Sequence, residues 1–289
     1  MVPAYHRGHL LYGEHLVRYR AADQLTSGKR VLDIACGSGY GTALLAQNAK
    51  YVFGVDLDAS AIEYADKNYA GQNIKFTLGS ATKIPLPDAS VETVVSFETI
   101  EHVEEYQEFL AEIRRVLTPD GLLILSTPND IAFPESNVFH VHEFVRKELI
   151  RELKKQFSHI EEYFQGAWIY SALLRREQLN GQWSESVQTL NEAPLAAEDA
   201  PYFLMLCSNA RIEEKLVPEA VISEPYSVRK IQEYEKSVRD FIEEQHKVIE
   251  HLDAKNKEGM NDAIELRKEL IYYQKRFGRV EELLNRFKK

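Results

Sequence analysis

The chain has 289 residues, and its two cysteines, Cys36 and Cys207, are too few for a disulfide framework. Hydrophobic residues make up 44% of it, enough for a sizeable core, but no apolar run reaches the roughly 18 residues of a membrane span. The formal charge is −10, and 32 acidic residues against 20 basic ones precede residue 226, which disfavours binding to duplex nucleic acid. We expect a cytoplasmic protein, because its first residues lack the pattern of a secretory signal.

The first half of the chain predicts alternating strands and helices. Apolar residues at helical spacing predict a leading helix over 9–25. Short apolar runs predict strands at 30–35, 51–56, 74–78, 91–97 and 122–126, and further strands at 162–169 and 201–207. Helical patterns cover 41–49, 60–69, 106–117 and 142–157, and the polar stretch 175–200 predicts a loop or short helices. This alternation predicts an α/β fold with a doubly wound, mostly parallel sheet and helices on both faces.

The last part of the chain changes to charged, helical sequence, so we expect two domains, 1–225 and 226–289. Apolar residues recur three and four apart from Ile231 to Leu252 and again from Ala263 to Phe287. The repeat shifts between these stretches, where Gly259 lies. The pattern is typical of a coiled coil that pairs two chains in a homodimer, of a hairpin within one chain, or of one helix packed on its own domain.

A strand, a glycine-rich turn and a helix succeed one another at the start of the predicted sheet. Gly37, Ser38 and Gly39 follow the first strand, where glycines allow a tight turn and leave room for a ligand against bare amides. Asp33 precedes the turn, where a carboxylate can face a ligand ammonium. Asp56 ends the second strand, 19 residues after Gly37, where an acid can accept hydrogen bonds from ribose hydroxyls. An adenosyl ligand with an amino-acid tail fits both acids, whereas a purely structural turn or another nucleotide explains them less well.

Four segments together resemble the successive motifs of class I S-adenosylmethionine-dependent methyltransferases over about residues 9–208. They are Asp33 to Gly41, Val55-Asp56, Gly79-Ser80-Ala81 with 84–87, and Ser96-Phe97-Glu98. The resemblance implies a seven-stranded sheet whose last strand is antiparallel.

The same resemblance implies roles for single residues. Gly37 and Gly39 lie beneath the methionine moiety, and Asp56 binds the ribose. Leu57 lies beside the adenine and Ala81 meets it, although Ser80 stands where the family usually has an acid. Ser38, Ser80 and Phe97, within these motifs, complete the predicted cofactor-binding set.

Polar residues follow the fourth predicted strand, where a ligand's reacting group is expected. Glu98, Glu101 and His102 are spaced i, i+3, i+4, which places them on one face of a helical turn. His140 and His142 follow the fifth strand, and we favour His142 because Glu143-Phe144 directly after it begin a predicted helix. The group predicts a general base, a divalent-metal site for Mg²⁺, or a local structural role.

The Glu-x-x-Glu-His unit is similar to one in ubiquinone-pathway O-methyltransferases and in small-RNA 3′-terminal 2′-O-methyltransferases, where it resembles a magnesium site. Ser126-Thr127-Pro128-Asn129, the His140 segment and His15 to Tyr19 resemble methyltransferases of bacterial polysaccharide and O-antigen loci. Tyr12, His15, Arg18 and Tyr19 then form a lid over the cofactor, or simply cover the sheet.

These resemblances imply methyl transfer to a hydroxyl of a saccharide or another small hydroxyl-bearing substrate, with S-adenosylmethionine as cofactor and Mg²⁺ as an optional helper. The alternatives are O- or N-methylation of a small aromatic or quinone metabolite, RNA methylation, which the acidic first half disfavours, and a non-enzymatic scaffold.

Overall fold

The computed structural model describes residues 10–132, 140–166 and 196–217, and in the last part of the chain 239–240, 242–243, 246–252 and 266–275. The chain divides into two compact units, residues 1–223 and 224–289. The sequence predicts this boundary two residues later, where the composition changes.

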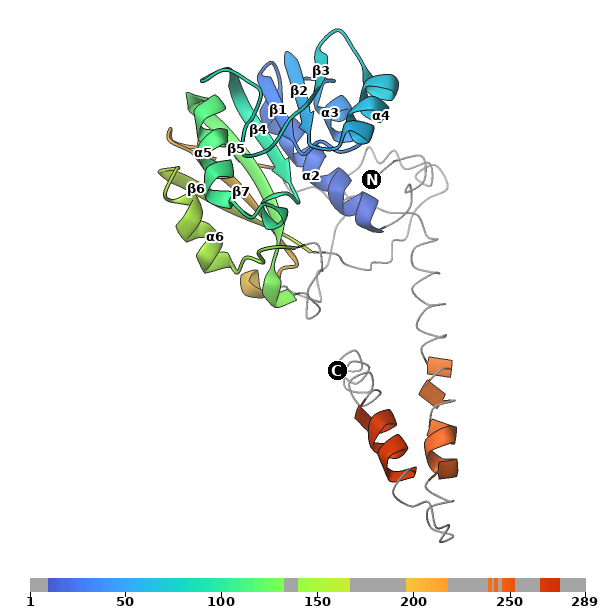
Figure 1. Ribbon diagram of the computed structural model, residues 1–289. Coiled ribbons are helices and arrows are strands. Elements are labelled where there is room, and N and C mark those ends of the chain that lie inside the picture. Colours follow the sequence, from blue (N-terminus) through green and yellow to red (C-terminus); the bar gives the residue numbers. More distant parts are fainter. Residues whose placement is uncertain are drawn as a thin grey trace, which may run out of the picture. The chain divides into compact units, whose positions relative to one another are not determined.

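Seven strands form one sheet in the first unit, in the order β3-β2-β1-β4-β5-β7-β6 (Figure 1). The strands are β1 (Arg30–Ile34), β2 (Tyr51–Asp56), β3 (Ile74–Leu78), β4 (Val91–Phe97), β5 (Leu117–Pro128), β6 (His159–Gln165) and β7 (Tyr202–Ser208). Strands β1 to β5 pair with one another in parallel, and β7 runs antiparallel to both β5 and β6. The predicted sheet with an antiparallel last strand is therefore confirmed.

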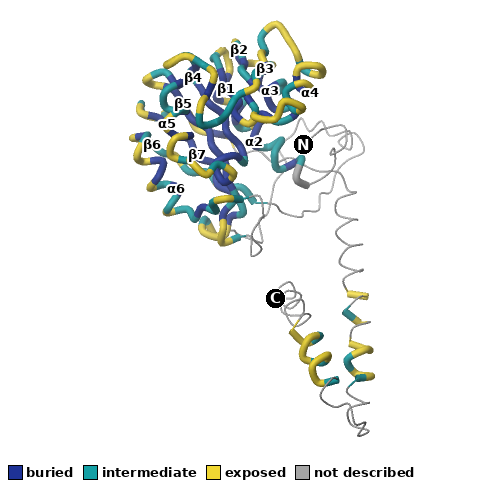
Figure 2. The backbone as a smooth tube through the Cα atoms, viewed as in Figure 1, coloured by how far each residue is buried: buried dark blue, intermediate teal, exposed yellow. Residues whose placement is uncertain are grey.

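Helices cover both faces of the sheet, and Figure 2 shows the buried residues concentrated between them. The helices are α2 (Leu10–Thr26), α3 (Tyr40–Leu45), α4 (Ala59–Tyr69), α5 (Tyr106–Val116) and α6 (Arg146–Leu153), with 3-10 turns η1 (Ile100–His102), η2 (Asp130–Ala132) and η4 (Ala197–Asp199). In β1, Val31 packs in the core with α2 and α3, whereas Leu32 packs in the other core with α5 and α6. Successive strand residues point to opposite faces, so strands covered on both sides must be continuously apolar.

Two element boundaries differ from the sequence prediction for a visible reason. Helix α6 begins at Arg146 and not at 142, because the backbone N–H groups of Val141 and His142 donate to the carbonyl of Glu101 and hold this segment outside the helix. Strand β5 begins at Leu117, five residues early, because Leu117 already pairs with Val91 of β4 before the Asp120-Gly121 turn. Part of the predicted 162–169 strand and most of 175–200 lie outside the described residues.

The second unit contains helical residues at 239–240, 242–243, 246–252 and 266–275. An ion pair between Lys247 Nζ and Glu243 Oε1, 3.0 Å long, joins residues four positions apart in the stretches 242–243 and 246–252. Gly259, where the sequence predicts a turn or a stutter, lies outside the described residues. Among the helices that the structure describes, none is both long and apolar enough to span a membrane.

Candidate functional site

The glycine turn after β1 has room above one glycine and none at the others. Gly37 and Gly39 adopt positive φ angles of 54° and 81°. A Cβ on Gly39 would lie 2.6 Å from Ala65 and 2.8 Å from Phe76, and one on Gly41 would overlap the ring of Tyr19. A Cβ on Gly37 would meet no atom within 4 Å. The turn is thus packed from below at Gly39 and Gly41, while the open side at Gly37 leaves space for a ligand.

Asp56 stands beside this turn, as its distance from Gly37 along the chain predicts. Its Oδ2 accepts from the Gly37 N–H at 2.7 Å and its Oδ1 from the Asp58 N–H at 2.9 Å. The next residue, Leu57, is 74% exposed although it is apolar, which fits a surface for a flat, weakly polar ring. The carboxylate is fixed by backbone donors and keeps further lone pairs for ribose hydroxyls.

Ser80 and Ala81 lie after β3 on the same side. The Ser80 hydroxyl accepts from the Thr82 N–H at 3.2 Å and lies 2.9 Å from the Thr82 hydroxyl. Ala81 packs partly buried against the core shared with α5. Ser80 therefore stabilises its own turn, and it offers a hydroxyl where the sequence motif usually has an acid.

Asp33, predicted to meet a ligand ammonium, is buried between β1, α2 and α3. Its side chain is 1% exposed, and its two oxygens accept from the Thr42 hydroxyl at 2.6 Å and the Tyr19 hydroxyl at 3.2 Å. Burial raises the pKa of Asp33 to about 7. Through these bonds Asp33 joins α2 and α3 to β1.

Phe97 and Ser38 are also largely buried. Phe97, the last residue of β4, is 6% exposed and its ring packs against Tyr19 with centroids 5.0 Å apart. Ser38 is 7% exposed within the glycine turn. Both residues are therefore part of the packed layer at the carboxyl ends of β1 and β4.

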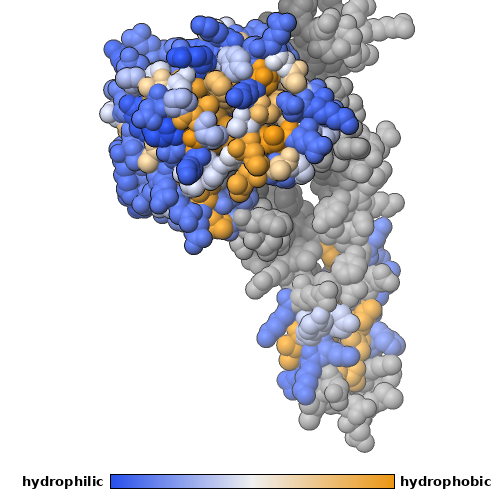
Figure 3. Space-filling view, turned by 45° about the horizontal axis from the view of Figure 1, so that its top comes forward, coloured by the Kyte–Doolittle hydropathy of each residue, from blue (hydrophilic) through white to orange (hydrophobic). Residues whose placement is uncertain are grey.

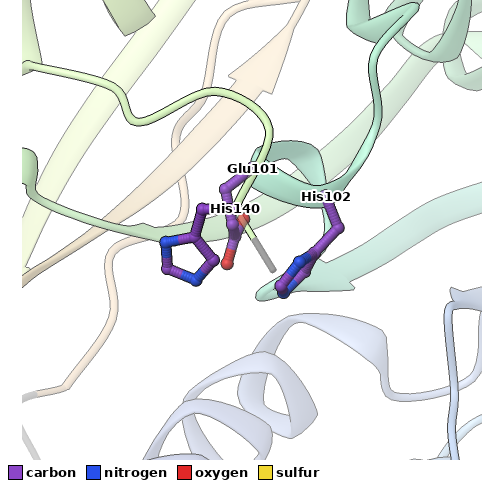
Figure 4. A group of neighbouring side chains, drawn as sticks. All are labelled: Glu101, His102 and His140. Carbon is purple, nitrogen blue, oxygen red and sulfur yellow. The ribbon is translucent and has the colours of Figure 1, made fainter. Parts of the chain in front are cut away.

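Glu101, His102 and His140 form a second group at the carboxyl end of β4 and β5. One ligand atom from each residue lies within 4.8 Å of the others, and Figure 4 shows the three side chains gathered together. Glu101 and His102 come from η1, whereas His140 comes from the segment before α6. The Glu101 carbonyl binds this segment through the Val141 and His142 N–H groups, at 2.9 and 3.2 Å. Backbone hydrogen bonds therefore set the position of His140 beside η1.

Glu101 is the most unusual member of the group. It is 1% exposed, its Oε2 accepts from the Thr127 hydroxyl at 3.0 Å, and its Oε1 has no hydrogen-bond partner among the described residues. Burial, aided by the charge of Glu98, raises the pKa of Glu101 to about 8. His140 Nδ1 lies 3.1 Å from Glu143 Oε1, a contact typical of histidines held in place for ligation.

The structure places Glu98 and His142 outside this group. Glu98 has φ of 51°, and η1 starts only at Ile100, so the predicted single helical face does not include Glu98. Its Oε1 accepts from the Ser126 hydroxyl at 2.9 Å. His142 Nε2 lies 3.5 Å from Glu148, and its ring packs on Phe144 with centroids 4.3 Å apart. His140 therefore takes the place for which the sequence analysis favours His142.

The leading helix adds buried polar residues over the same edge. Arg18 is 2% exposed, its Nη1 donates to Gln165 Oε1 at 3.2 Å, and its guanidinium lies 4.7 Å from the centre of the Tyr202 ring. Tyr202 in turn donates to Glu14 Oε2 at 3.2 Å, and burial raises the pKa of Glu14. The sequence analysis names Arg18 only as part of a lid. Gln165 and Tyr202 carry no spacing signal, because they come from β6 and β7, far along the chain.

Exposed apolar side chains are frequent at the carboxyl ends of the strands. They include Leu57 directly after β2, Leu78 at the end of β3, Ile131 in η2, 63% exposed, and Val141 next to His140, 58% exposed. Figure 3 shows one face of the first unit on which hydrophobic residues gather within a hydrophilic border. An apolar patch of this kind is typical of a ligand or partner surface.

Comparisons with known proteins agree with the fold. Residues 32–125 match the family model of a methyltransferase domain. A protein of Mycolicibacterium smegmatis named a probable S-adenosylmethionine-dependent methyltransferase is 35% identical over 52% of this chain and 60% of its own length. This region of the chain is therefore similar to methyltransferase domains, including those of proteins named as S-adenosylmethionine-dependent enzymes.

Two further relatives carry more specific names. The fatty-acid O-methyltransferase of M. smegmatis is 32% identical over 39% of this chain and 42% of its own length. The phthiotriol/phenolphthiotriol dimycocerosates methyltransferase 1 of Mycobacterium ulcerans is 34% identical over 39% and 43%. The chain thus spans 60% or less of the length of the three relatives named here.

A solved structure supports the fold independently. A protein described as a methyltransferase, in complex with the Haloferax volcanii Trm112 methyltransferase activator, superposes with a TM-score of 0.52 over 71% of this chain and 94% of its own. Its sequence identity is 16%, so the likeness concerns the fold alone.

Proposed function

We propose that the protein is an O-methyltransferase that uses S-adenosylmethionine to methylate a hydroxyl group of a saccharide. The observation that carries this proposal is the group of Glu101, His102 and His140 at the carboxyl end of β4 and β5. A hydroxyl is a weak nucleophile with a high pKa, so its methylation needs a base or a cation beside it. A site for a softer nucleophile would not need this polar group.

The residues around the glycine turn fit the cofactor. Asp56 would hold the ribose hydroxyls, the open side of Gly37 would accommodate the chain beyond the ribose, and Leu57 and Ala81 would flank the adenine. When bound, S-adenosylmethionine supplies a methyl group activated on a sulfonium sulfur. The protein's share is to orient the acceptor, to exclude water and to take up the hydroxyl proton.

The second group fits a divalent cation such as Mg²⁺. The buried Glu101 Oε1 lacks a hydrogen-bond partner among the described residues, and such an oxygen is costly unless a donor or a cation completes it. His102 and His140 would supply further ligands, and Glu143 would fix the ring of His140. A cation with open positions would bind neighbouring sugar hydroxyls and lower their pKa. Without a cation, His102 is the residue that would accept the proton.

A lipid acceptor is a second candidate, favoured by one observation. Val141 follows His140, donates its backbone N–H to the Glu101 carbonyl and is apolar and 58% exposed, which suits an acceptor with an apolar part. The names of the fatty-acid O-methyltransferase and the phthiotriol dimycocerosates methyltransferase point the same way.

Methyl transfer from tritium-labelled S-adenosylmethionine to a panel of acceptors tests both candidates. The panel contains neutral oligosaccharides with vicinal diols, long-chain fatty acids and a quinol. The proposal expects label in an oligosaccharide. Label only in fatty acids would establish the second candidate, and label only in the quinol would contradict both.

Metal binding is tested without turnover. Mn²⁺ binding followed by electron paramagnetic resonance should be strong in the wild type and in His142→Ala, and weak in Glu101→Gln and His140→Ala. Equal Mn²⁺ binding by all four proteins, or methyl transfer that is insensitive to EDTA, would contradict the proposed cation site. His102 would then be the base.

We further propose that residues 226–289 pair two chains into a homodimer. The support is the three- and four-residue apolar spacing, together with helical stretches at 246–252 and 266–275. Light scattering of the full chain should give a dimer. A monomer would support a hairpin within one chain instead.

A further inference from the structure

Arg18 is a buried cation, and one edge of its guanidinium group makes no hydrogen bond to the described residues. Its Nε and Nη2 atoms are buried and have no hydrogen-bond partner in the part of the chain that the structure describes. These two nitrogens form the fork that grips a carboxylate with parallel hydrogen bonds. Three other arginines among the described residues use the same pair in this way, at distances of 2.7 to 3.3 Å: Arg30 on Glu92, Arg115 on Glu112 and Arg146 on Glu162.

The position of Arg18 connects this fork to the glycine turn. The neighbouring Tyr19 bonds to Asp33 of β1 and packs on Phe97, the last residue of β4. Arg18 itself lies 3.5 Å from Glu98, directly after β4. The strand order reverses between β1 and β4, and in open α/β sheets ligands bind at the carboxyl ends of the strands at such a point.

The charges around Arg18 favour a zwitterion over a simple anion. Glu98 Oε1 lies 3.5 Å from Arg18 Nη1, so any anion on the Nε–Nη2 fork would also feel this carboxylate. An amino-acid group brings an ammonium together with its carboxylate, and the ammonium would offset Glu98. Asp33, the acid expected to meet an ammonium, is already bonded to Thr42 and Tyr19.

We propose that Arg18 and Glu98 hold the amino-acid end of S-adenosylmethionine, with its carboxylate on the Arg18 Nε–Nη2 fork and its ammonium beside Glu98. This assignment rests on the proposed use of that cofactor. It makes α2 part of the cofactor site, and it gives Glu98 a binding role separate from the group of Glu101, His102 and His140.

The test uses two ligands that differ only in the amino-acid end. S-adenosylhomocysteine carries it, and 5′-methylthioadenosine has the same adenosine and thioether without it. Calorimetric titration of the full chain should show that Arg18→Gln weakens S-adenosylhomocysteine binding about tenfold or more, since a charge-assisted fork is lost. Binding of 5′-methylthioadenosine should change less than about twofold, because the adenosine contacts remain. Arg18→Lys, which keeps the charge but not the fork, should fall between wild type and Arg18→Gln.

Two further proteins and one analogue complete the experiment. Arg30→Gln removes a similar fork at the start of β1 and should leave both affinities unchanged. The analogue of S-adenosylhomocysteine without its carboxylate should bind equally to wild type and Arg18→Gln, but more weakly to Glu98→Gln.

The outcomes separate this proposal from the proposed function. Equal weakening of both ligands by Arg18→Gln would show a merely structural role and overturn the proposal, as would unchanged S-adenosylhomocysteine affinity. A wild-type protein that binds neither ligand would contradict the use of the cofactor itself.

Discussion

Two groups of polar residues at the carboxyl ends of the strands, the glycine turn and the group around η1, differ in how their acids are bonded. At the glycine turn, Asp33 and Asp56 each have both oxygens bonded, by hydroxyls and backbone N–H groups. Beyond β4, the buried Glu101 has one oxygen that is bonded and one that has no partner among the described residues. Arg18 Nε and Nη2 also have no hydrogen-bond partner there. The acids of the glycine turn are therefore held in place by the protein itself, whereas Glu101 and Arg18 keep buried polar atoms that are available to a ligand.

This difference has a consequence for substitution. Changes at the glycine turn should act first on stability, because they break contacts that the folded protein already has. Changes around Glu101 should act first on activity, because the contacts they remove form with the acceptor or a cation.

The largest effect is expected on turnover for Glu101→Ala. Loss of this carboxylate should lower kcat roughly 10²- to 10⁴-fold, the contribution of a general base or of a cation held in its place. S-adenosylhomocysteine affinity should stay within about threefold of wild type, because Glu101 lies outside the glycine turn. Steady-state kinetics on the accepted substrate and calorimetry measure the two quantities.

Three histidine variants serve as the comparison for that measurement. His140→Ala should lower kcat more than His142→Ala, because only His140 lies beside Glu101 and His102. His159→Ala, at the exposed start of β6, should leave turnover unchanged. Turnover of Glu101→Ala equal to that of His159→Ala would contradict the role of the Glu101 group.

At the glycine turn, Gly39→Ala should cost far more stability than Gly37→Ala. Both residues have positive φ, which costs an L-residue roughly 1–2 kcal/mol. Gly39→Ala also overlaps Ala65 and Phe76, and overpacking adds about 1–3 kcal/mol, whereas Gly37→Ala enters open space. Urea unfolding of the three proteins measures the difference. Equal destabilisation would mean that the turn is not packed as described.

The glycine turn could be predicted from the sequence, whereas the Glu101 group could be predicted only in part. The reason is physical. Asp33, Gly37 and Asp56 belong to one β1–α3–β2 unit, so their spacing along the chain fixes their approach. The fold was predictable on the same basis, since strands buried on both faces must be continuously apolar.

The region after β4 is built from segments that lie far apart in the sequence, and no local sequence pattern predicts that they meet. His140 is positioned by backbone hydrogen bonds from Val141 and His142 to Glu101, and a side-chain pattern does not report these. The i, i+3, i+4 spacing suggested a helical face for Glu98, but the chain turns through positive φ at Glu98 before η1 begins. Arg18, Gln165 and Tyr202 meet only because α2, β6 and β7 converge in the fold.

The pH dependence of stability should depend on Asp33. Its pKa is raised from 3.8 to about 7 in the folded protein, so the folded state binds the proton more tightly than the unfolded state. Stability is therefore greatest below about pH 4 as far as this group is concerned, and falls as pH rises from 4 to 7. Asp33→Asn cannot titrate, so its melting temperature should fall less than that of wild type over this range. Thermal unfolding of both proteins at pH 5, 6, 7 and 8 measures the slopes, and parallel curves would show that Asp33 is charged throughout.

The smallest effects are expected from two threonines, each of which donates a hydroxyl hydrogen bond to a buried carboxyl group. Thr42 donates to Asp33 Oδ2 at 2.6 Å, and Thr127 donates to Glu101 Oε2 at 3.0 Å. Valine has nearly the same shape as threonine, so Thr42→Val and Thr127→Val each remove one hydroxyl without opening a cavity. Each change leaves a buried carboxyl group short of a donor, at a cost of about 1–3 kcal/mol.

The two threonine variants should differ in what else they change. Asp33 keeps the Tyr19 hydroxyl as a donor, so Thr42→Val should lower the free energy of unfolding and leave kcat within about twofold of wild type. Glu101 has no second side-chain donor among the described residues, so Thr127→Val should also lower kcat severalfold, because the carboxylate loses the bond that orients it. Urea unfolding and steady-state kinetics on both variants decide the matter. If Thr127→Val lost stability alone, as Thr42→Val is expected to, Glu101 would be a buried structural acid. The glycine turn and the group around η1 would then not differ in the way proposed.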